Sequence, residues 1–578
     1  MHPCLDWSAT EIARRVAARE ISAREVCQAF IARCEQVHPQ LNALVWTRFE
    51  AALEDAAGID EKITRGAALG PLAGVPLTVK ECFFVEGSPT TIGLTNRAGK
   101  EPDLEREWVD DKWLNELAIQ QSFEDMKASG DLGSWQPYLE DRRVRAGAEK
   151  MRRRTCPLVH QLQQAGGVLL GKTNVPQLML WHECDNPVYG RTNNPWDLER
   201  TPGGSTGGEA ALIAAHGSPL GLGTDMGGSM RVPAAWCGIS ALMPTARRVP
   251  AGGTLQNFGW LEAIALAIGP LARHVEDLDL LMRVLLSPPK SMNLRQRTDH
   301  EFAVPPLAWP DFRKIDVSGL RIGIPRLWSM LQSPAVERAE REAIEALEAA
   351  GATVVDDGFF VSDMQTYLGL ITADGGACLR EIARGSELDW RASRVMWLAG
   401  LGGLSRGLLV EALRWTGQQK LAAMVSSGGP ISAKGFGELI RAQQAAKYMA
   451  LSEWNRYQLD AIVVAPHLLP APQHGKPIDL VPAAEPAYYA NLLGWPAGVV
   501  PVTTVREDEQ TCRHEKTRDR VLQQAAAVDA GSAGLPVGVQ VIARPWREDI
   551  VLAVMAAIER AIPRPVCPFL RDSSAAGR

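Results

Sequence analysis

The sequence predicts an α/β protein with a central β-sheet. Short apolar runs, among them residues 75–79 and 167–170, alternate with glycine-rich loops and with segments of helical periodicity. This alternation is typical of strands and helices that pack around one sheet. Of the 578 residues, 46% are hydrophobic, which is enough to fill a large interior. We expect one large domain over residues 1–578.

Three segments stand apart from that alternation. Residues 1–70 are expected to form a helical arm, with Ser8 and Ser22 as the N-caps of two helices. Residues 101–154 are charged and contain Trp113, and we interpret them as an insertion in a loop. Residues 390–430 begin with an apolar stripe at helical spacing that several glycines interrupt, which predicts two short helices with a bend and a possible apolar cap.

The overall composition argues against several classes of function. Lys and Arg number 61 and Asp and Glu number 67, so the net charge of -6 offers no basic footprint for a nucleic acid. The ten cysteines form no Cys-x-x-Cys pair, which indicates a reducing compartment and no metal site. The chain reaches Asp6 without the apolar run of a signal peptide, and a cytoplasmic location is therefore expected.

Two glycine-rich turns each present one serine. Residues 201–209 read Thr-Pro-Gly-Gly-Ser-Thr-Gly-Gly-Glu around Ser205, and residues 221–233 contain Gly-Gly-Ser around Ser229. Glycines let the backbone fold tightly and turn its N–H groups toward a ligand, while a serine at such a turn can act as a nucleophile. Linker turns and a phosphate cradle remain alternatives on the pattern alone.

Lys80 follows the apolar run at residues 75–79 directly. Partial burial at the end of a strand would disfavour its charged form and make the amine available as a base. An ordinary surface lysine at a strand end is the alternative.

A nucleotide-binding protein is the rival hypothesis from another class. Residues 166–173 satisfy the phosphate-loop expression Gly-x-x-x-x-Gly-Lys-Thr. The context argues against it, because residues 168–170 are strand-like and Asn-Val-Pro follows where a helix should begin. His182 and Cys184 have no evident catalytic or metal-binding partner, so we interpret them as packing or wall residues.

The ordered motifs together resemble the amidase signature family. The Lys80 strand, Gly-Lys-Thr-Asn at 171–174, Asn-Pro-Trp at 194–196 and both serine loops occur in the order found in that family. The resemblance covers residues 42–97 and 157–562 and implies a mixed central sheet with helices on both faces. It also implies an amide hydrolase that needs no metal or organic cofactor. A closer likeness, at 217–221, 495–505 and 534–537, is to the branch that cleaves fatty acyl amides.

The resemblance also implies roles for individual residues. Ser229 would be the nucleophile that forms an acyl-enzyme, Ser205 the bridging serine on a cis peptide, and Lys80 the terminal base. Groups expected to contact the substrate or its oxyanion are Met179, Met226, Gly227, Gly228 and Ser229. Residues expected to support the nucleophile loop are Thr206, Asp225 and Arg231. Thr206 stands where the family usually has a second serine.

The sequence leaves several alternatives for the substrate and the partners. A lipophilic or fatty acyl amide is expected, and the alternatives are small or aryl amides, carbamates, or a role as an amidotransferase-type subunit. The 390–430 segment resembles a membrane cap and carries Arg391, Arg394 and Arg406, so a peripheral membrane contact and an ordinary half-buried hairpin are both open. The partner expected is a small-molecule amide, and a homodimer is also open.

Overall fold

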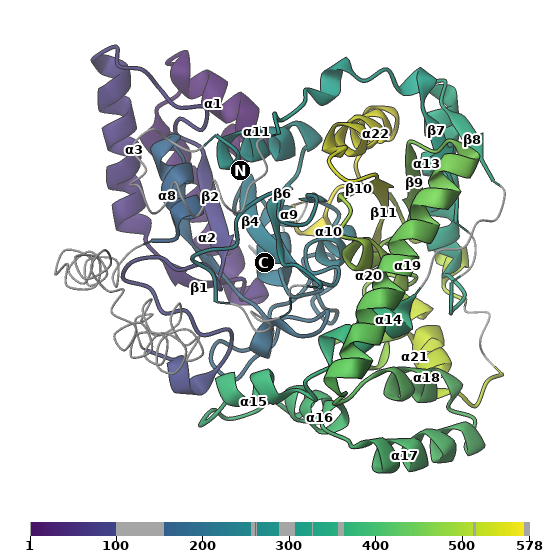
Figure 1. Cartoon of the computed structure of the whole chain (residues 1–578). Helices are drawn as coiled ribbons and strands as arrows, with labels where there is room; N and C mark the ends of the chain where they lie inside the picture. Colours follow the sequence, from purple (N-terminus) through teal and green to yellow (C-terminus); the bar gives the residue numbers. More distant parts are fainter. Residues whose placement is uncertain are drawn as a thin grey trace, which may run out of the picture.

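The computed structural model describes residues 2–99, 155–255, 261, 263–287, 307–325, 328–356, 363–511 and 516–570, so the expected insertion at 101–154 lies outside the described residues. It contains one eleven-stranded sheet of mixed direction with the order β1-β3-β2-β4-β6-β5-β10-β11-β9-β7-β8 (Figure 1). The predicted α/β class with a central mixed sheet is confirmed. The strands are β1 Leu44–Thr47, β2 Pro76–Lys80, β3 Val168–Thr173, β4 Leu220–Asp225, β5 Ser240–Met243, β6 Ala267–Ala272, β7 Arg321–Gly323, β8 Thr353–Val355, β9 Ala461–Val464, β10 Ala497–Thr504 and β11 Pro536–Ala543.

Helices cover both faces of this sheet. Gly498 of β10 faces α22, because an added Cβ would lie 2.2 Å from the Met555 sulfur. Gly538 of β11 faces the opposite way, since its added Cβ would lie 3.5 Å from Ala235 of α10. The helices outside the cap are α1 Ala9–Ala17, α2 Ala23–Leu41, α3 Phe49–Thr64, α8 Pro157–Gln164, α9 Gly207–Ala214, α10 Arg231–Cys237, α11 Val275–Leu285, α13 Pro334–Ala349, α19 Ala433–Tyr457, α20 Glu485–Leu493, α21 Arg520–Asp529 and α22 Glu548–Ala561.

The N-terminal segment begins as the sequence predicts. The Ser8 hydroxyl accepts a hydrogen bond from the Glu11 N–H at 3.1 Å, and the Ser22 hydroxyl accepts one from the Glu25 N–H at 3.0 Å, so both N-caps are confirmed. The segment is not purely helical, because β1 pairs with β3 at the edge of the sheet. Its sequence Leu-Val-Trp-Thr is rich in residues that favour strands, and this run is too short to show a clear period.

Three neighbouring strands bring two of the motifs to one edge of the sheet. Strand β2 runs parallel to both β3 and β4, with Val79 opposite Leu222. Parallel strands present their carboxyl ends at the same edge of a sheet. The segments that follow Lys80 and Asp225 therefore leave the sheet side by side, and this edge is where the candidate site forms.

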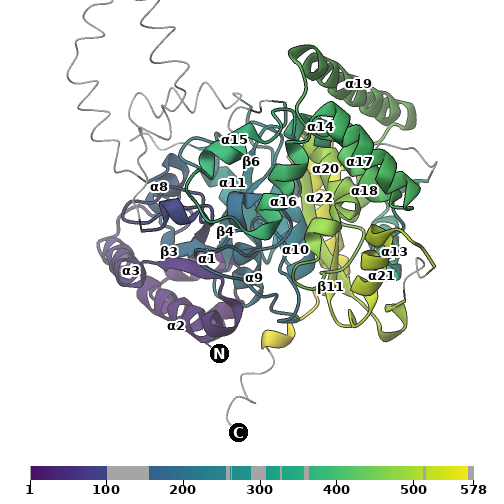
Figure 2. The ribbon, with the colours of Figure 1, turned by 90° about the horizontal axis from the view of Figure 1, so that it is seen from below.

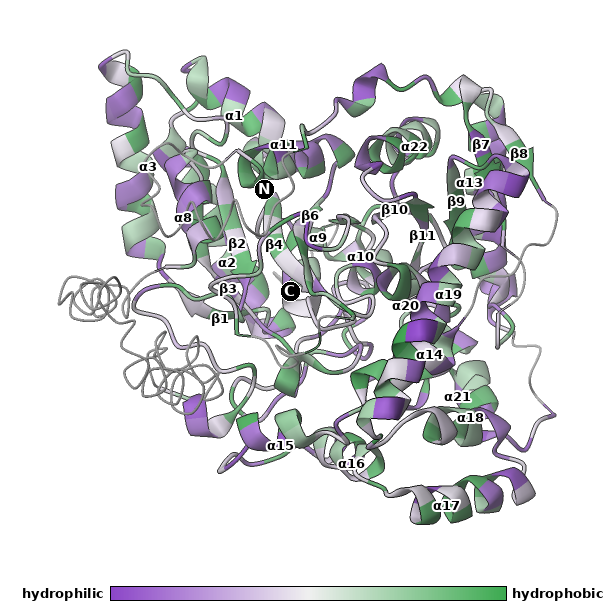
Figure 3. Cartoon of the chain, in the orientation of Figure 1, coloured by the Kyte–Doolittle hydropathy of each residue, from purple (hydrophilic) through white to green (hydrophobic). Residues whose placement is uncertain are grey.

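Five helices, here named the cap helices, lie together at one side of the sheet (Figures 1 and 2). They are α14 Met364–Ile371, α15 Ala377–Ile382, α16 Trp390–Ala399, α17 Gly403–Trp415 and α18 Gln419–Ser427. The predicted bend is confirmed, since α16 and α17 meet at 112°. Hydrophobic residues recur along α16, α17 and α18 (Figure 3). Within the described ranges no single helix is long and apolar enough to cross a membrane, and the α16–α17 pair passes that test by length and composition only.

Candidate active site

Ser229 lies in the turn between β4 and α10. The turn needs glycine at two positions before the serine. Gly228 has a φ of +86°, which glycine adopts without strain, and a Cβ added at Gly227 would lie 2.3 Å from the Tyr367 hydroxyl oxygen. Ser229 is half-buried and lines the cavity described below.

Ser205 lies just before α9, and the Gly204–Ser205 peptide bond is cis, as the resemblance implies. Gly204 packs against the backbone of the neighbouring loop, where an added Cβ would lie 2.5 Å from the Trp181 carbonyl oxygen. The Thr206 N–H donates to the Ser229 carbonyl at 3.0 Å, and the Thr206 hydroxyl donates to the Thr224 carbonyl at 3.1 Å. Thr206 thus joins the two serine loops through its backbone and its side chain.

Lys80 is fully buried at the end of β2. Its Nζ lies 2.7 Å from the Ser205 Oγ and 2.7 Å from the Thr224 Oγ1, with the Thr224 carbonyl oxygen at 3.4 Å. These neighbours are neutral, and burial lowers the pKa of Lys80 from its ordinary value. A neutral Lys80 amine can accept a proton from Ser205, so the arrangement provides a buried base in contact with a hydroxyl.

An ionic network supports the turn that carries Ser229. The Asp225 carboxylate accepts hydrogen bonds from the Gly228 N–H at 2.8 Å and the Met230 N–H at 3.0 Å. It also accepts from the Arg231 Nη2 at 3.0 Å. Burial by itself raises the pKa of Asp225, but the Arg231 charge and the hydrogen bonds outweigh it and bring that pKa to about 2. The ionised pair therefore fixes the turn around Ser229.

The backbone N–H groups of this turn differ in their availability. Within the described part of the chain, no intramolecular hydrogen bond is recorded from the N–H of Met226, Gly227 or Ser229. The N–H of Gly228 differs from the expectation, because it already donates to Asp225 and lies 3.1 Å from the Asn491 Oδ1. Gly228 consequently serves to hold the turn, and three open N–H groups remain at the cavity.

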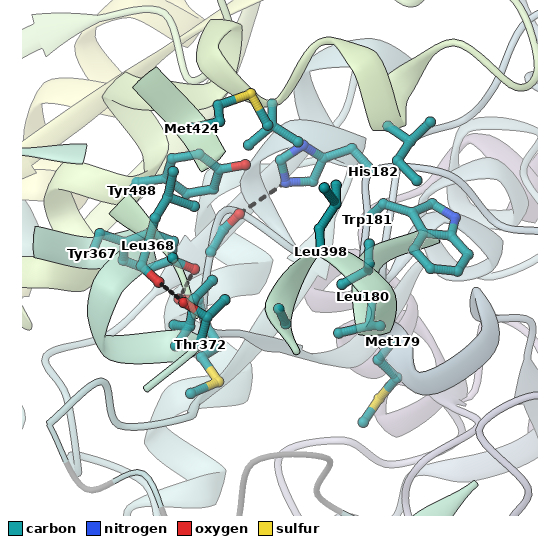
Figure 4. Close-up of a pocket in the computed structure, with 18 of the residues that line it drawn as sticks. Met179, Leu180, Trp181, His182, Tyr367, Leu368, Thr372, Leu398, Met424 and Tyr488 are labelled. Atoms are coloured by element: carbon teal, nitrogen blue, oxygen red, sulfur yellow. Dashed lines mark hydrogen bonds between the residues drawn. The ribbon is translucent and has the colours of Figure 1, made fainter. Parts of the chain in front are cut away.

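The Met179 loop also reaches the cavity. Leu178 and Met179 have φ values of +59° and +52°, a left-handed conformation that is uncommon for residues other than glycine. Such backbone conformations concentrate at functional sites. The loop continues into Leu180, Trp181 and His182, which all line the cavity (Figure 4).

The cavity has a volume of about 250 Å³ and is predominantly apolar. Both serines and Met226 line it, and the cap helices α14, α15, α16 and α18 supply ten of its other lining residues. Aliphatic residues from α14, α16 and α18 that line it are Leu368, Ile371, Val395, Leu398, Leu421, Met424 and Val425. Arg391 anchors α16 to the core, because its guanidinium lies 2.7 Å from both Glu183 and Asp185.

The phosphate-loop alternative is wrong. Residues Val168–Thr173 form strand β3, and no helix begins at Lys172. The Lys172 Nζ is buried and donates to the Pro89 carbonyl at 2.6 Å and to the Thr90 hydroxyl at 2.8 Å. Lys172 therefore ties a loop to the sheet. Cys184 is buried as expected, and burial raises the pKa of its thiol to about 12, so the thiol stays protonated at neutral pH.

The sequence interpretation missed three residues that support the site. Thr224, which contacts Lys80, stands within the Gly-Thr-Asp motif, and this motif could have identified it from the sequence. Glu209 follows the Ser205 loop and accepts hydrogen bonds from Thr78 of β2 and Thr173 of β3. Asn491 of α20 donates to Asp225 at 3.0 Å, and no local pattern marks it.

Comparison with known proteins decides the family. A family model described as Amidase matches residues 25–110 and 145–552. Fatty-acid amide hydrolase 1 of Sus scrofa is 32% identical over 562 residues, which is 95% of this chain and 85% of that protein. The chain belongs to the amidase signature family. It is an amidase, as expected from the ordered motifs.

Two further members of the amidase signature family are similar over different lengths. A glutamyl-tRNA(Gln) amidotransferase subunit from Chloroflexus aggregans is 35% identical over 345 residues, which cover 59% of this amidase and 58% of that protein. A solved structure of a fatty acid amide hydrolase matches with a TM-score of 0.76 at 22% identity, covering 98% of this chain and 87% of that one. The structural match extends the shared fold over nearly the whole chain.

Proposed function

We propose that this amidase hydrolyses amides of long, apolar acyl chains through an acyl-enzyme on Ser229. The observation that carries the proposal is the apolar cavity, which both serines line and to which four of the cap helices contribute aliphatic side chains. An acyl chain bound there would leave water for aliphatic contacts, which stabilises binding by roughly 0.8 kcal/mol per methylene. Similarity to fatty-acid amide hydrolase 1 supports the same substrate class.

The first step of the proposed reaction forms a tetrahedral intermediate on Ser229. Neutral Lys80 accepts the proton of Ser205 while Ser205 accepts the proton of Ser229. The Ser229 oxygen bonds to the carbonyl carbon, and the carbonyl oxygen becomes an oxyanion. The open N–H groups at the cavity stabilise this charge. They belong to Met226, Gly227 and Ser229.

The later steps form the acyl-enzyme and then return the enzyme to its starting state. The tetrahedral intermediate breaks its C–N bond as Ser205 gives a proton to the leaving amine and regains one from Lys80. The acyl group is then an ester of Ser229. Water attacks this ester, passes its proton into the same relay, and releases a carboxylic acid and free Ser229.

A series of anilides from acetyl to palmitoyl tests the substrate class. We expect kcat/KM of the purified chain to rise with acyl length, by up to roughly fourfold per methylene at first, and then to level off when the cavity is full. A flat series with good turnover of acetanilides would instead favour an amidase for small or aryl amides. No turnover by the chain alone would favour an amidotransferase-type subunit.

We further propose that the cap helices contact a membrane surface. Large apolar side chains on α16 and α17 face solvent, with exposed fractions of 60% for Trp397, 83% for Leu404, 68% for Leu408 and 90% for Trp415. A patch of this kind is typical of an interaction surface. Arg414 lies beside it with about half of its side chain exposed and forms an ion pair with Glu411 at 2.7 Å, so the exposed apolar area carries this proposal.

Replacement of the exposed face tests the membrane proposal. The triple change Leu404→Ser, Leu408→Ser and Trp415→Ser should weaken binding to vesicles that contain phosphatidylserine and lower long-chain turnover. It should spare turnover of a soluble acetanilide, and the melting temperature should stay close to that of the wild type because these side chains are exposed.

A matched triple on α19 controls for the loss of exposed apolar area. Tyr448, Met449 and Leu451 are also exposed there, and their change to serine should leave vesicle binding intact. An equal loss of vesicle binding in both triple variants would contradict a specific contact between the cap helices and the membrane. Unfolding of the cap triple would mean that these residues belong to a packed core.

A further inference from the structure

Three rings stack beside the nucleophile turn, here named the ring stack. Tyr367 of α14 and Tyr488 of α20 have ring centroids 4.6 Å apart and planes at 10°. Tyr488 stacks on His182 with centroids 6.1 Å apart and planes at 22°. Figure 4 shows all three at the cavity wall. The rings come from segments about 120 to 300 positions apart in the sequence, so only the tertiary structure assembles them.

The outer members of the ring stack hold two successive carbonyl groups of the turn. The Tyr367 hydroxyl donates to the Met226 carbonyl oxygen at 3.1 Å. The His182 Nε2 lies 2.9 Å from the Gly227 carbonyl oxygen, and because a carbonyl only accepts, Nε2 must carry the proton. Burial lowers the pKa of His182, so the ring is neutral and Nδ1 is unprotonated.

These contacts fix the orientation of the adjacent N–H groups. In a planar trans peptide the C=O and the N–H point in opposite directions. Tyr367 therefore directs the Gly227 N–H through the Met226 carbonyl, and His182 directs the Gly228 N–H through the Gly227 carbonyl. The latter N–H meets Asp225, so that peptide plane is held at both ends. Without such contacts two consecutive glycines would rotate readily.

We propose that Tyr367 and His182 are positioning residues of the oxyanion site. Tyr367 orients the Gly227 N–H for the oxyanion, and His182 holds the Gly227–Gly228 peptide that follows it. This inference rests on the proposed Ser229 mechanism and adds the residues that set its oxyanion site. Neither side chain needs to touch the reacting atoms. Tyr367 belongs to a cap helix, so the cap that encloses the acyl chain also supports the groups that stabilise the transition state.

Two variants remove the hydrogen bonds and keep the rings. Tyr367→Phe and His182→Phe should each lower kcat by about tenfold to a hundredfold, less than the loss of a direct oxyanion donor, with KM nearly unchanged. The amide N–H of a glutamine can donate as His182 does, so His182→Gln should recover much of the lost kcat. Affinity for a long-chain trifluoromethyl ketone, whose adduct carries the oxyanion, should fall by the same factor as kcat/KM.

Two control variants test whether the same kinds of substitution affect kcat away from the site. Tyr448→Phe and His160→Phe change exposed residues outside the site and should leave kcat unaltered. If Tyr367→Phe folds normally and keeps full kcat and full inhibitor affinity, the positioning role is wrong. A rise in KM at constant kcat would also contradict it. Failure of the Ser229 mechanism is distinct, because Ser229→Ala would then retain turnover whatever the ring variants do.

Discussion

Ser229→Ala should lose amide turnover by several powers of ten, on the order of 10⁴-fold or more. Only a hydroxyl is removed from a half-buried turn, so the melting temperature should change little. Acid quenching of the wild type during turnover should leave the acyl mass on the peptide that contains residue 229. The variant should show no such adduct, and a fluorophosphonate should label the wild type at Ser229.

The control is Ser452→Ala on the exposed side of α19, which should keep wild-type turnover. Inactivating fluorophosphonate labelling at a different serine would overturn the assignment of the nucleophile. Retained turnover in Ser229→Ala would do the same.

Lys80→Ala should lower kcat by about two to four powers of ten, the range for loss of a general base. The reason is the position of Nζ, which is buried and lies 2.7 Å from the Ser205 hydroxyl. Lys62→Ala, on the exposed side of α3, controls for the loss of a positive charge and should have full activity. A Lys80→Ala enzyme within about tenfold of the wild type would contradict the relay.

The dependence of activity on pH should reflect the titration of Lys80. Burial lowers the pKa of Lys80, so its protonated form predominates only below this lowered pKa. Activity should therefore rise with pH as Lys80 loses its proton, and then level off. Residual activity of Lys80→Ala should lack this inflection. An unchanged profile in the variant would assign the titration to another group.

The local features of the fold follow from the sequence because neighbouring residues determine them. Ser8 and Ser22 cap helices as predicted, and the apolar run before Lys80 is strand β2. The positive φ of Gly228 is likewise a local property of its turn. The ordered motifs resemble those of the amidase signature family, and this resemblance implied the three residues of the proposed relay.

The hydrogen bonds and the exposure of individual groups depend on contacts between segments that are distant in the sequence. Gly228 looks like a fourth oxyanion donor in the sequence, but its N–H is taken by Asp225 and Asn491. The apolar stripe at 390–415 fits a packed hairpin equally well by periodicity, whereas the structure exposes Leu404 and Leu408. Periodicity reports that residues share a helix face and cannot report what covers that face.

The sequence by itself determined the ordered family motifs, the two serine turns and the strand that ends at Lys80, since each motif is formed by residues close together in the chain. The tertiary structure decided which of these groups meet. Parallel β2 and β4 bring Lys80 to Thr224, and the order of the sheet brings Asn491 to Asp225 across 266 positions. The ring stack also depends on the tertiary structure. Its hydrogen bonds to Met226 and Gly227 come from Tyr367 and His182, which are distant in the sequence and are brought to the turn by the packing of the core.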